Sequence, residues 1–454
     1  MSHASFVTNH QINAEYNART GLNPLDLCAR ATLTPDTPEK PFTREDLSVW
    51  QLNALTKVYA YAQKNSRYYR KTLGSHCELP ITSAHQFAKL PRTNQDALRG
   101  APLDFLCTSQ DDIARIVTLS TSGSTGNPKR LFFTQGELDD TVHFFHHGMR
   151  CIVSEGETVL ALLPATKPDS VGNLLANGLN ELGAIPILHE TPDNVLKALE
   201  LLCLHRPSCI IGTPAHVLAL AKMWKKEKLP VQSVQSVLLC WDASSPAIRQ
   251  QVSTIWDCHV HTHWGMTETG LGGAVSCKHG HGMHLRETDL YVEITDPDTG
   301  EILPDGERGE IVVTTLNRLG MPLIRYRTGD ESYIIPETCE CGSALRMLSP
   351  DIRRLTPPSG APRWYNTITP AKLDEYLTAF PEIIAQQARY VAATNTLEIT
   401  IDTCGNCSLS LPSIAAHLGA QIAHLQCAPN VSCLPGIKTG NISIGFAKRR
   451  IHFD

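Results

Sequence analysis

The sequence predicts an α/β protein with a large N-terminal domain of mixed or parallel sheets and a small β-subdomain, followed by a small α+β domain. Between Glu157 and Ala243, apolar strand-like runs alternate with helical patterns, which is typical of βαβ units. Residues 289–315 read instead as strands joined by Asp, Pro and Gly turns, which predicts antiparallel pairing. After a Pro-rich stretch the alternation restarts, so we place a boundary near Leu355, between domains 1–355 and 356–454.

The individual elements follow from local patterns. From Ser48 to Leu73, apolar residues recur at helical spacing and predict an amphipathic helix. The strands expected next are "ETVLALLPA", "IPILHE", "SCIIGTP" and "SVQSVLLCWDA", with a helix between each pair and the last of these helices at Ala215 to Glu227. In the second domain, "TPAKLDEYLTAF" predicts a helix, "QQARYVAATNTLEITID" predicts strands, and another helix and a strand follow.

Composition narrows the class of protein. The chain has 454 residues, of which 42% are hydrophobic and 19% charged, as expected of a soluble globular protein. Its net charge of -5 gives no basic surplus, so we expect no nucleic acid partner. Without a long apolar run or a secretory leader, we expect a cytoplasmic protein with no membrane partner. The fifteen cysteines are scattered, which predicts reduced core thiols, except for the close pair Cys339 and Cys341.

The segment "TSGSTGNPK", from Thr121 to Lys129, has the composition of a phosphate-binding loop. Glycines allow backbone N–H groups to turn inward, hydroxyls donate to phosphate oxygens, and one lysine supplies positive charge. The spacing is not that of a Walker loop. The residues expected to hold a polyphosphate are Thr121, Ser122, Gly123, Ser124, Thr125, Gly126 and Lys129.

Four motifs in order carry a resemblance to a known family. The loop is followed by "WGMTETG" from Trp264, "GERGEIVVTTL" from Gly306 and "RYRTGD" from Arg325. In this order they resemble the adenylate-forming enzymes, the acyl-CoA synthetase and AMP-binding superfamily. The N-terminal "QLNALTKVYAYAQKNSRYYRKTL", "GMHLRETDLYVEITDPDTGE" and a Cys-x-Cys after "TGD" are similar to the phenylacetate-CoA ligase branch. The resemblance implies an adenylate-forming N-terminal domain and a mobile C-terminal one.

The resemblance also implies a reaction and a set of roles. Such enzymes join ATP and a carboxylic acid into an acyl adenylate, and coenzyme A then takes the acyl group. Thr267 would contact the α-phosphate, and Glu268 would hold Mg²⁺, which prefers oxygen ligands. Asp330 would accept the ribose hydroxyls of ATP or AMP.

Other motif positions have expected contacts with the adenine or the acid. The family's Gly-Ala-Glu-Pro adenine segment aligns with "CWDA", so Asp242 would replace the glutamate and Trp241 adds bulk. Trp264, Gly265 and Met266 are expected to contact the nucleotide, close to the reacting groups. The walls of the acyl pocket are expected from Trp264, Met266, Gly272 and Gly273, with ordinary core packing as the alternative for Trp264.

Cysteine and histidine spacing predicts a structural zinc site. In "ETCECGSAL" the glycine permits the turn that brings Cys339 and Cys341 onto one ion. Cys277 begins "CKHGHGMHL", which offers nitrogen ligands. The branch resemblance favours His284 as the histidine ligand of the zinc, with His281 as the alternative. If no metal binds, Cys339 and Cys341 are expected to be surface thiols.

Two segments depart from the family pattern. The hinge, usually Gly-Arg-x-Asp-Asp-Met, reads "SPDIRRL", and Pro350 cannot supply an arginine contact. Near the C-terminus, "IGFAKRRIHFD" places Phe446 where the adenylation lysine is expected. Lys448 would share a strand face with Phe446, and Lys438 is a second candidate.

Three functions are therefore carried forward from the sequence. The first is an AMP-forming ligase that joins coenzyme A to a small carboxylic acid, with aryl and arylacetic acids among the candidates. The second is an adenylate-forming enzyme with another acceptor. The third is a catalytically weak nucleotide-binding protein. The resemblance also implies a homodimer, and the sequence does not identify the acid.

Overall fold

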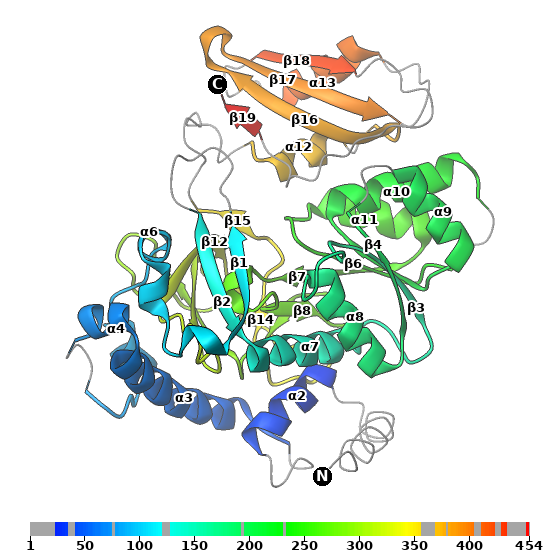
Figure 1. Ribbon diagram of the computed structural model, residues 1–454. Helices are drawn as coiled ribbons and strands as arrows, with labels where there is room; N and C mark the ends of the chain where they lie inside the picture. The colour runs from blue at the N-terminus through cyan, green and yellow to red at the C-terminus, as the bar shows by residue number, and fades with distance from the viewer. Residues whose placement is uncertain are drawn as a thin grey trace.

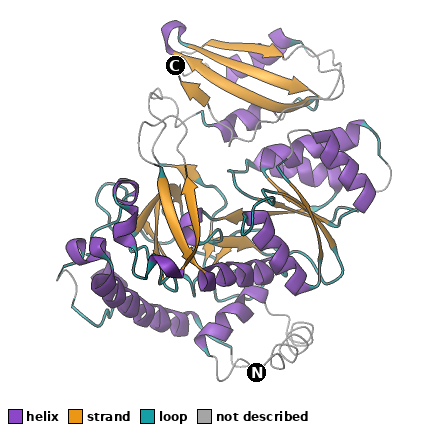
Figure 2. Cartoon of the chain, in the orientation of Figure 1, coloured by secondary structure: helices purple, strands orange, loops and turns teal. Residues whose placement is uncertain are grey.

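The computed structural model describes residues 23–34, 41–74, 78–119, 128–191, 195–229, 233–355, 368–377, 380–403, 410–422, 428–433 and 451–453 (Figures 1 and 2). The predicted phosphate-loop residues Thr121–Gly126 lie outside the described residues. So do Lys438, Phe446 and Lys448. No helix in the described ranges is long and apolar enough to cross a membrane.

The first elements that the structure describes are helices (Figure 1). They are α2 (Pro24–Leu33), α3 (Arg44–Asn65), α4 (Arg67–Thr72), α5 (Ala84–Ala88) and α6 (Gln95–Gly100). The single helix expected from Ser48 to Leu73 is divided at Ser66, whose backbone is extended. Because the Ser66 hydroxyl accepts from the N–H of Tyr69 at 3.2 Å, the same residue that ends α3 begins α4.

A nine-stranded mixed sheet forms the centre of the large domain, in the order β13-β14-β9-β8-β7-β6-β5-β3-β4. Its parallel strands are β3 (Thr158–Leu162), β4 (Ile185–His189), β5 (Cys209–Gly212), β6 (Ser236–Leu239) and β7 (His259–Trp264). Its antiparallel strands are β8 (Ala274–Ser276), β9 (Met283–Leu285), β13 (Ile334–Ile335) and β14 (Met347–Leu348). The predicted α/β class with a mixed sheet is confirmed.

Helices cover both faces of the parallel strands (Figure 1). One face carries α7 (Gln135–Met149) and α8 (Val171–Leu182), and the other carries α9 (Val195–His205), α10 (Pro214–Lys226) and α11 (Pro246–Trp256). On β3, Val159 and Ala161 pack with α7 and α8, whereas Leu160 and Leu162 pack with α9 and α10. This two-sided burial explains the continuous apolar runs in the sequence.

Two smaller β structures complete the large domain. Antiparallel strands β10 (Leu290–Thr295), β11 (Gly309–Thr315), β12 (Tyr326–Ser332) and β15 (Arg353–Arg354) form one sheet. Strands β1 (Ile113–Leu119) and β2 (Lys129–Thr134) pair with each other and flank the predicted phosphate loop. The antiparallel pairing expected within residues 289–315 is confirmed.

The C-terminal elements form a separate sheet with its own core. They are α12 (Pro370–Leu377), β16 (Ile383–Val391), β17 (Thr396–Thr403), α13 (Leu411–Ile422), β18 (Ala428–Cys433) and β19 (Ile451–Phe453). On the side facing the large domain, Lys222 Nζ on α10 donates to the carbonyl of Ile383 at 2.6 Å. The division at Leu355 itself stays a prediction.

Candidate active site

The candidate site is built around residues 263–268, where β7 ends and the short 3₁₀ helix η3 (Thr267–Thr269) begins. In open α/β sheets, ligands bind beyond the carboxyl ends of parallel strands. Gly265 makes the sharp exit possible, because a Cβ there would lie 2.8 Å from both His263 Cε1 and the carbonyl oxygen of Leu271. The tight turn therefore brings the predicted Thr267 and Glu268 directly to the strand end.

Glu268 lies in a group of polar side chains, here called the polar cluster, made of the buried residues Lys129, Glu268 and Tyr326 and the half-buried Gln95. Lys129 Nζ forms an ion pair with Glu268 Oε1 and lies 3.0 Å from the Tyr326 hydroxyl oxygen and 3.4 Å from Gln95 Oε1. The Tyr326 hydroxyl donates to Glu268 Oε1 at 2.9 Å. The lysine at the end of the predicted loop thus contacts the predicted metal carboxylate directly.

The charges of the polar cluster compensate one another. Burial alone would raise the pKa of Glu268, but Lys129 and the Tyr326 hydroxyl outweigh it and hold that pKa below its ordinary value. The pKa of Tyr326 is raised by burial and by the Glu268 carboxylate, so the phenol keeps its proton and remains a donor. Glu268 is therefore an ionised carboxylate with 2% of its surface exposed.

Arg318, which the sequence analysis did not predict, holds the backbone of Glu268 in the polar cluster. Its guanidinium donates to the carbonyl oxygen of Glu268 at 2.7 Å and to that of Phe132 at 3.2 Å. It therefore ties the turn after β7 to strand β2, which begins with Lys129. The sequence carries no signal for this role, because Arg318 lies in a loop beyond the recognised motif.

Asp330 lies on β12 and is partnered from two sides. Trp264 Nε1 donates to Asp330 Oδ2 at 3.1 Å, and Arg354 NH1 lies 2.9 Å from Asp330 Oδ1. The predicted Trp264 and Asp330 are thus brought together, and Trp264 is also a buried core residue. Arg354 belongs to the "SPDIRRL" segment, so this hinge segment supplies an arginine contact to Asp330 in spite of Pro350.

The expected adenine segment follows β6. Asp242 is half-buried, and its Oδ1 accepts from the N–H of Ala243 at 2.9 Å. Trp241 has a φ of 73° and 40% of its surface exposed. A bulky residue rarely adopts this left-handed backbone, so the fold holds a large aromatic side chain at the surface at some conformational cost.

An apolar cavity of about 60 Å³ lies on the other side of the β7 exit. Its walls come from α7, α8 and several strands: Phe144, Phe145, Gly148, Met149, Leu163, Val171, Leu175, Ile211, Leu238, Cys240, His263, Leu271 and Val275. None of the four residues expected to wall an acyl pocket lines this cavity. Gly272 instead packs directly against the lining residue Phe144, because a Cβ at Gly272 would lie 2.3 Å from Phe144 Cδ1.

His263 is the one imidazole in the cavity wall. Its Nε2 is buried and has no hydrogen-bond partner among the described residues. Burial lowers the pKa of His263 to about 4, so the ring is neutral at physiological pH. A neutral, unpartnered ring nitrogen at an apolar wall is available to a polar group on a bound molecule.

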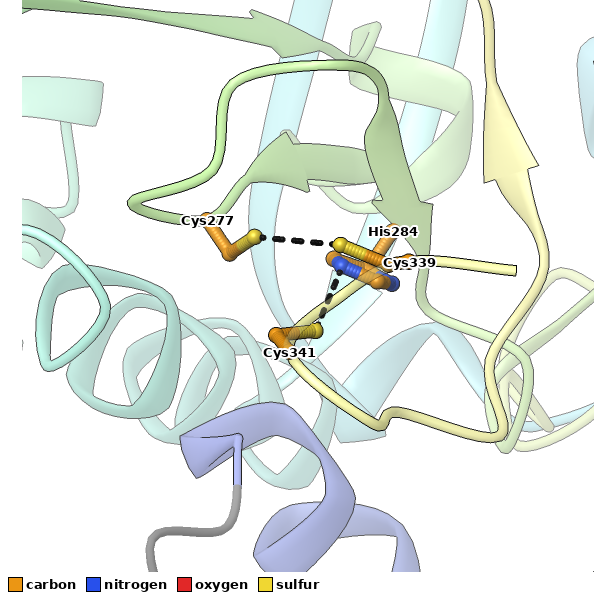
Figure 3. A group of neighbouring side chains, drawn as sticks. All are labelled: Cys277, His284, Cys339 and Cys341. Carbon is orange, nitrogen blue, oxygen red and sulfur yellow. Dashed lines mark hydrogen bonds between the residues drawn. The ribbon is translucent and has the colours of Figure 1, made fainter. Parts of the chain in front are cut away.

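The four residues of the predicted zinc site lie together at the far end of the sheet (Figure 3). Their ligand atoms all lie within 4.8 Å of one another, with Cys277 Sγ 3.6 Å from Cys339 Sγ and Cys341 Sγ 3.3 Å from His284 Nε2. His284 Nδ1 lies 3.4 Å from the carbonyl oxygen of Leu345. The alternative ligand His281 is exposed.

Comparisons with known proteins give a consistent result. A family model described as "AMP-binding enzyme" matches residues 61–317. The chain is 27% identical to a phenylacetate-coenzyme A ligase of Thermus thermophilus over 364 residues, covering 78% of this chain and 80% of the relative. It is 25% identical to the phenylacetate-coenzyme A ligase of Escherichia coli, covering 65% and 68%.

A solved structure has a similar fold. It is a 2-hydroxyisobutyryl-CoA ligase in the postadenylation state, with a TM-score of 0.72 and 19% sequence identity. The match covers 90% of this chain and 89% of that chain. It extends the likeness in fold beyond the residues that the family model matches.

Proposed function

Because the chain belongs to the AMP-binding enzyme family, we propose that it is an AMP-forming ligase that activates a small carboxylic acid and transfers the acyl group to coenzyme A. The acid's carboxylate attacks the α-phosphorus of ATP, pyrophosphate leaves, and the thiol of coenzyme A then displaces AMP. The observation that carries this proposal is the buried polar cluster, where Lys129 keeps Glu268 ionised beside the end of β7.

The polar cluster fits a magnesium ion by its chemistry. Mg²⁺ takes carboxylate and phosphate oxygens, and Glu268 offers an ionised carboxylate beside a segment expected to contact phosphate. A bound Mg²⁺ would neutralise phosphate charge. In this proposal Lys129 turns from Glu268 toward phosphate oxygens, Thr267 contacts the α-phosphate, and Asp330 accepts the ribose hydroxyls.

Several proposed contacts lie in segments outside the described residues. The residues Thr121–Gly126 would hold the β and γ phosphates with their N–H groups and hydroxyls. Lys448 or Lys438 would stabilise the charge that develops on the α-phosphate. Within the described residues, Asp242 would accept from the adenine amino group.

We further propose that the apolar cavity receives the acyl chain, and its size supports a small acid. Apolar cavities that take up benzene have volumes of about 150 Å³, whereas this one has about 60 Å³. A short aliphatic chain fits without rearrangement, while a phenyl ring needs Phe144 or its neighbours to move. The unpartnered His263 Nε2 favours an acid with a hydrogen-bonding group, such as a hydroxyl, on its chain.

The cluster of Cys277, His284, Cys339 and Cys341 fits a structural zinc ion. Three sulfurs and one imidazole nitrogen form a closed tetrahedral set, and the Leu345 carbonyl can orient the imidazole through Nδ1. The zinc would hold the antiparallel end of the large sheet together. Elemental analysis of the purified protein should find zinc, and Cys339→Ser should remove it.

The central test of the proposed function is pyrophosphate release from Mg-ATP with a panel of short aliphatic, hydroxylated and aryl acids, each with and without coenzyme A. We expect acid-dependent release that turns over only with coenzyme A, fastest with a short acid. Acid-dependent release without coenzyme A turnover would point to another acceptor. Nucleotide binding without any pyrophosphate release would exclude a ligase. A cytoplasmic location and a homodimer are also part of the proposal, and size-exclusion chromatography with light scattering tests the dimer.

A further inference from the structure

A second group of potential metal ligands shares no residue with the polar cluster, the apolar cavity or the zinc cluster. Cys28 on α2 and His143 and His147 on α7 offer one ligand atom each, and these atoms lie within 4.8 Å of one another. The two histidines are four residues apart on one helix, so both rings point to the same side. Their ring centroids are 4.5 Å apart.

The buried histidine has a nitrogen with no assigned use. His147 is 6% exposed, and its Nδ1 has no hydrogen-bond partner among the described residues. The ring also makes a hydrogen bond with the backbone of Pro24. Because proline has no N–H and His147 Nδ1 has no partner among the described residues, the donor is the N–H of Nε2 and the acceptor is the Pro24 carbonyl oxygen. A metal-binding histidine commonly has this arrangement, with one nitrogen on the ion and the other on a backbone carbonyl. Such a buried lone pair is costly unless something binds it.

The charges around the group suit a divalent cation. Three charged residues act electrostatically on Cys28: Asp140, Arg286 and Asp289. Arg286 is already paired, because its NH2 donates to Asp289 Oδ1 at 3.0 Å and its guanidinium stacks on Phe144. The Cys28 thiolate and the two carboxylates would offset a divalent ion and the Arg286 guanidinium, while Arg150, which acts electrostatically on His147, adds one further positive charge.

We propose that Cys28, His143 and His147 form a second metal site, which takes a divalent transition-metal ion such as Zn²⁺ and clamps α2 onto α7. One thiolate and two imidazoles are ligands for such ions rather than for Mg²⁺ or Ca²⁺. Three protein ligands leave a fourth position for water, and the exposed His143 provides the entry path. On binding, the Cys28 thiol loses its proton to solvent as the metal–sulfur bond forms.

The clamp would act on a helix that already touches the four-residue cluster. Asn23 Nδ2 donates to Cys341 Sγ at 3.4 Å, and Asp26 accepts from the N–H of Ala344 at 3.3 Å. Figure 3 shows α2 beside the loop of Cys341. The helix would then be held on one side by hydrogen bonds to Cys341 and Ala344 and on the other by the second ion.

Cobalt titration of the metal-free full-length protein tests this proposal, because each thiolate bound to Co²⁺ adds near-ultraviolet charge-transfer absorption. We expect Cys28→Ser to bind one equivalent less than the wild type. His143→Gln, at an exposed position, should lose the same equivalent without affecting folding. The matched control Cys203→Ser, which removes an exposed cysteine outside the group, should bind as the wild type does.

Hydrogen exchange supplies a second readout that does not depend on activity. Metal should slow amide exchange in α2 of the wild type and of Cys203→Ser, but not in His143→Gln. Equal cobalt stoichiometry in His143→Gln and wild type would overturn the proposal. So would metal protection of α2 that persists in this variant.

Discussion

The polar cluster and the apolar cavity lie at opposite ends of the segment His263–Glu268, and they differ in how their polar atoms are partnered. At the Glu268 end, the carboxylate, the Lys129 ammonium and the Tyr326 hydroxyl all contact one another. At the His263 end, a single ring nitrogen faces apolar side chains and has no hydrogen-bond partner among the described residues. One end is arranged to keep charges ionised in the interior, and the other leaves a neutral polar atom for a ligand.

This difference separates two tasks within one reaction. Phosphate chemistry needs charges that are present and fixed before the substrate arrives, because preorganised groups cost no reorganisation during reaction. Recognition of an acid needs shape and one or two directional groups. Changes in the polar cluster should therefore affect turnover for every acid, while changes in the cavity should affect the choice among acids.

Removing the charge at Glu268 should have the largest effect. In Glu268→Gln the buried Lys129 loses its partner, so we expect the free energy of unfolding to fall by about 3–5 kcal/mol. We expect kcat to fall about 10²–10³-fold with every acid, a loss typical of a missing electrostatic contact to the transition state. Urea unfolding and pyrophosphate release measure the two effects.

A matched control separates stability from chemistry. Glu287 is another fully buried carboxylate, paired with Arg346 at 2.9 Å and with Arg44. Burial alone would raise its pKa, but the two arginines hold that pKa below its ordinary value, as Lys129 does at Glu268. Glu287→Gln should destabilise the protein and leave kcat of the folded enzyme unchanged. Near-normal turnover in Glu268→Gln would show that the polar cluster is only structural.

A methyl group at Gly272 should disturb the cavity rather than the polar cluster. Its Cβ would lie 2.3 Å from Cδ1 of Phe144, so this ring of the cavity wall or the Gly272 backbone must shift. Overpacking of this kind costs about 1–3 kcal/mol. For Gly272→Ala we expect a higher KM for the best acid and a smaller change for ATP, measured by steady-state kinetics.

The control for this variant adds the same methyl group elsewhere on the cavity wall. A Cβ at Gly148 would lie 3.5 Å from Val275 Cγ1, which is ordinary contact, so Gly148→Ala should be tolerated. If both variants lose the same affinity for acid, the position of Phe144 does not set the acyl pocket.

The unpartnered His263 should make stability depend on pH. Its folded pKa of about 4 is below the ordinary value of 6.5, so the unfolded chain binds the proton more readily. The group carries no penalty above pH 6.5 and destabilises the fold increasingly as the pH falls toward 4. At pH 5 this penalty is about 2 kcal/mol.

Replacing the ring should remove that penalty and change acid preference. We expect His263→Leu to flatten the fall in the free energy of unfolding between pH 7 and 5, as measured by urea titration. Because burial also lowers the pKa of His261 to about 4, part of the slope should persist. The variant should also lose preference for hydroxylated over plain acids. An unchanged pH slope would mean that His263 titrates equally in both states.

The two ends also differ in how far the sequence predicts them. Lys129, Glu268 and Asp330 stand in continuous motifs, and the structure brings their neighbourhoods together as the order of motifs implies. Tyr326 was missed although its motif was recognised, and alternation on β12 could have found it, since Tyr326 and Asp330 share one face of the strand.

The cavity could not be predicted from the sequence in the same way. Phe144, Leu175 and Ile211 are apolar residues within ordinary helix and strand patterns, and only tertiary packing places them around one space. The expected wall residues Gly272 and Gly273 lie instead behind the lining, where their missing side chains make room for Phe144 and Trp264. Motifs therefore locate the reacting groups, whereas the shape that selects the acid depends on residues without a motif.

Arg354 provides the smallest and most selective test of the polar end. Its side chain is 52% exposed, so the ion pair with Asp330 should add only about 0–1 kcal/mol to stability. For Arg354→Ala we expect an unchanged unfolding midpoint and a KM for ATP raised a few-fold, because Asp330 loses the contact that orients it toward the ribose. Arg353→Ala is the matched control, since the neighbouring side chain is 54% exposed and pairs with Asp351 instead. A raised KM for the acid, with the KM for ATP unchanged, would place Asp330 at the acyl end and contradict its assignment to the nucleotide.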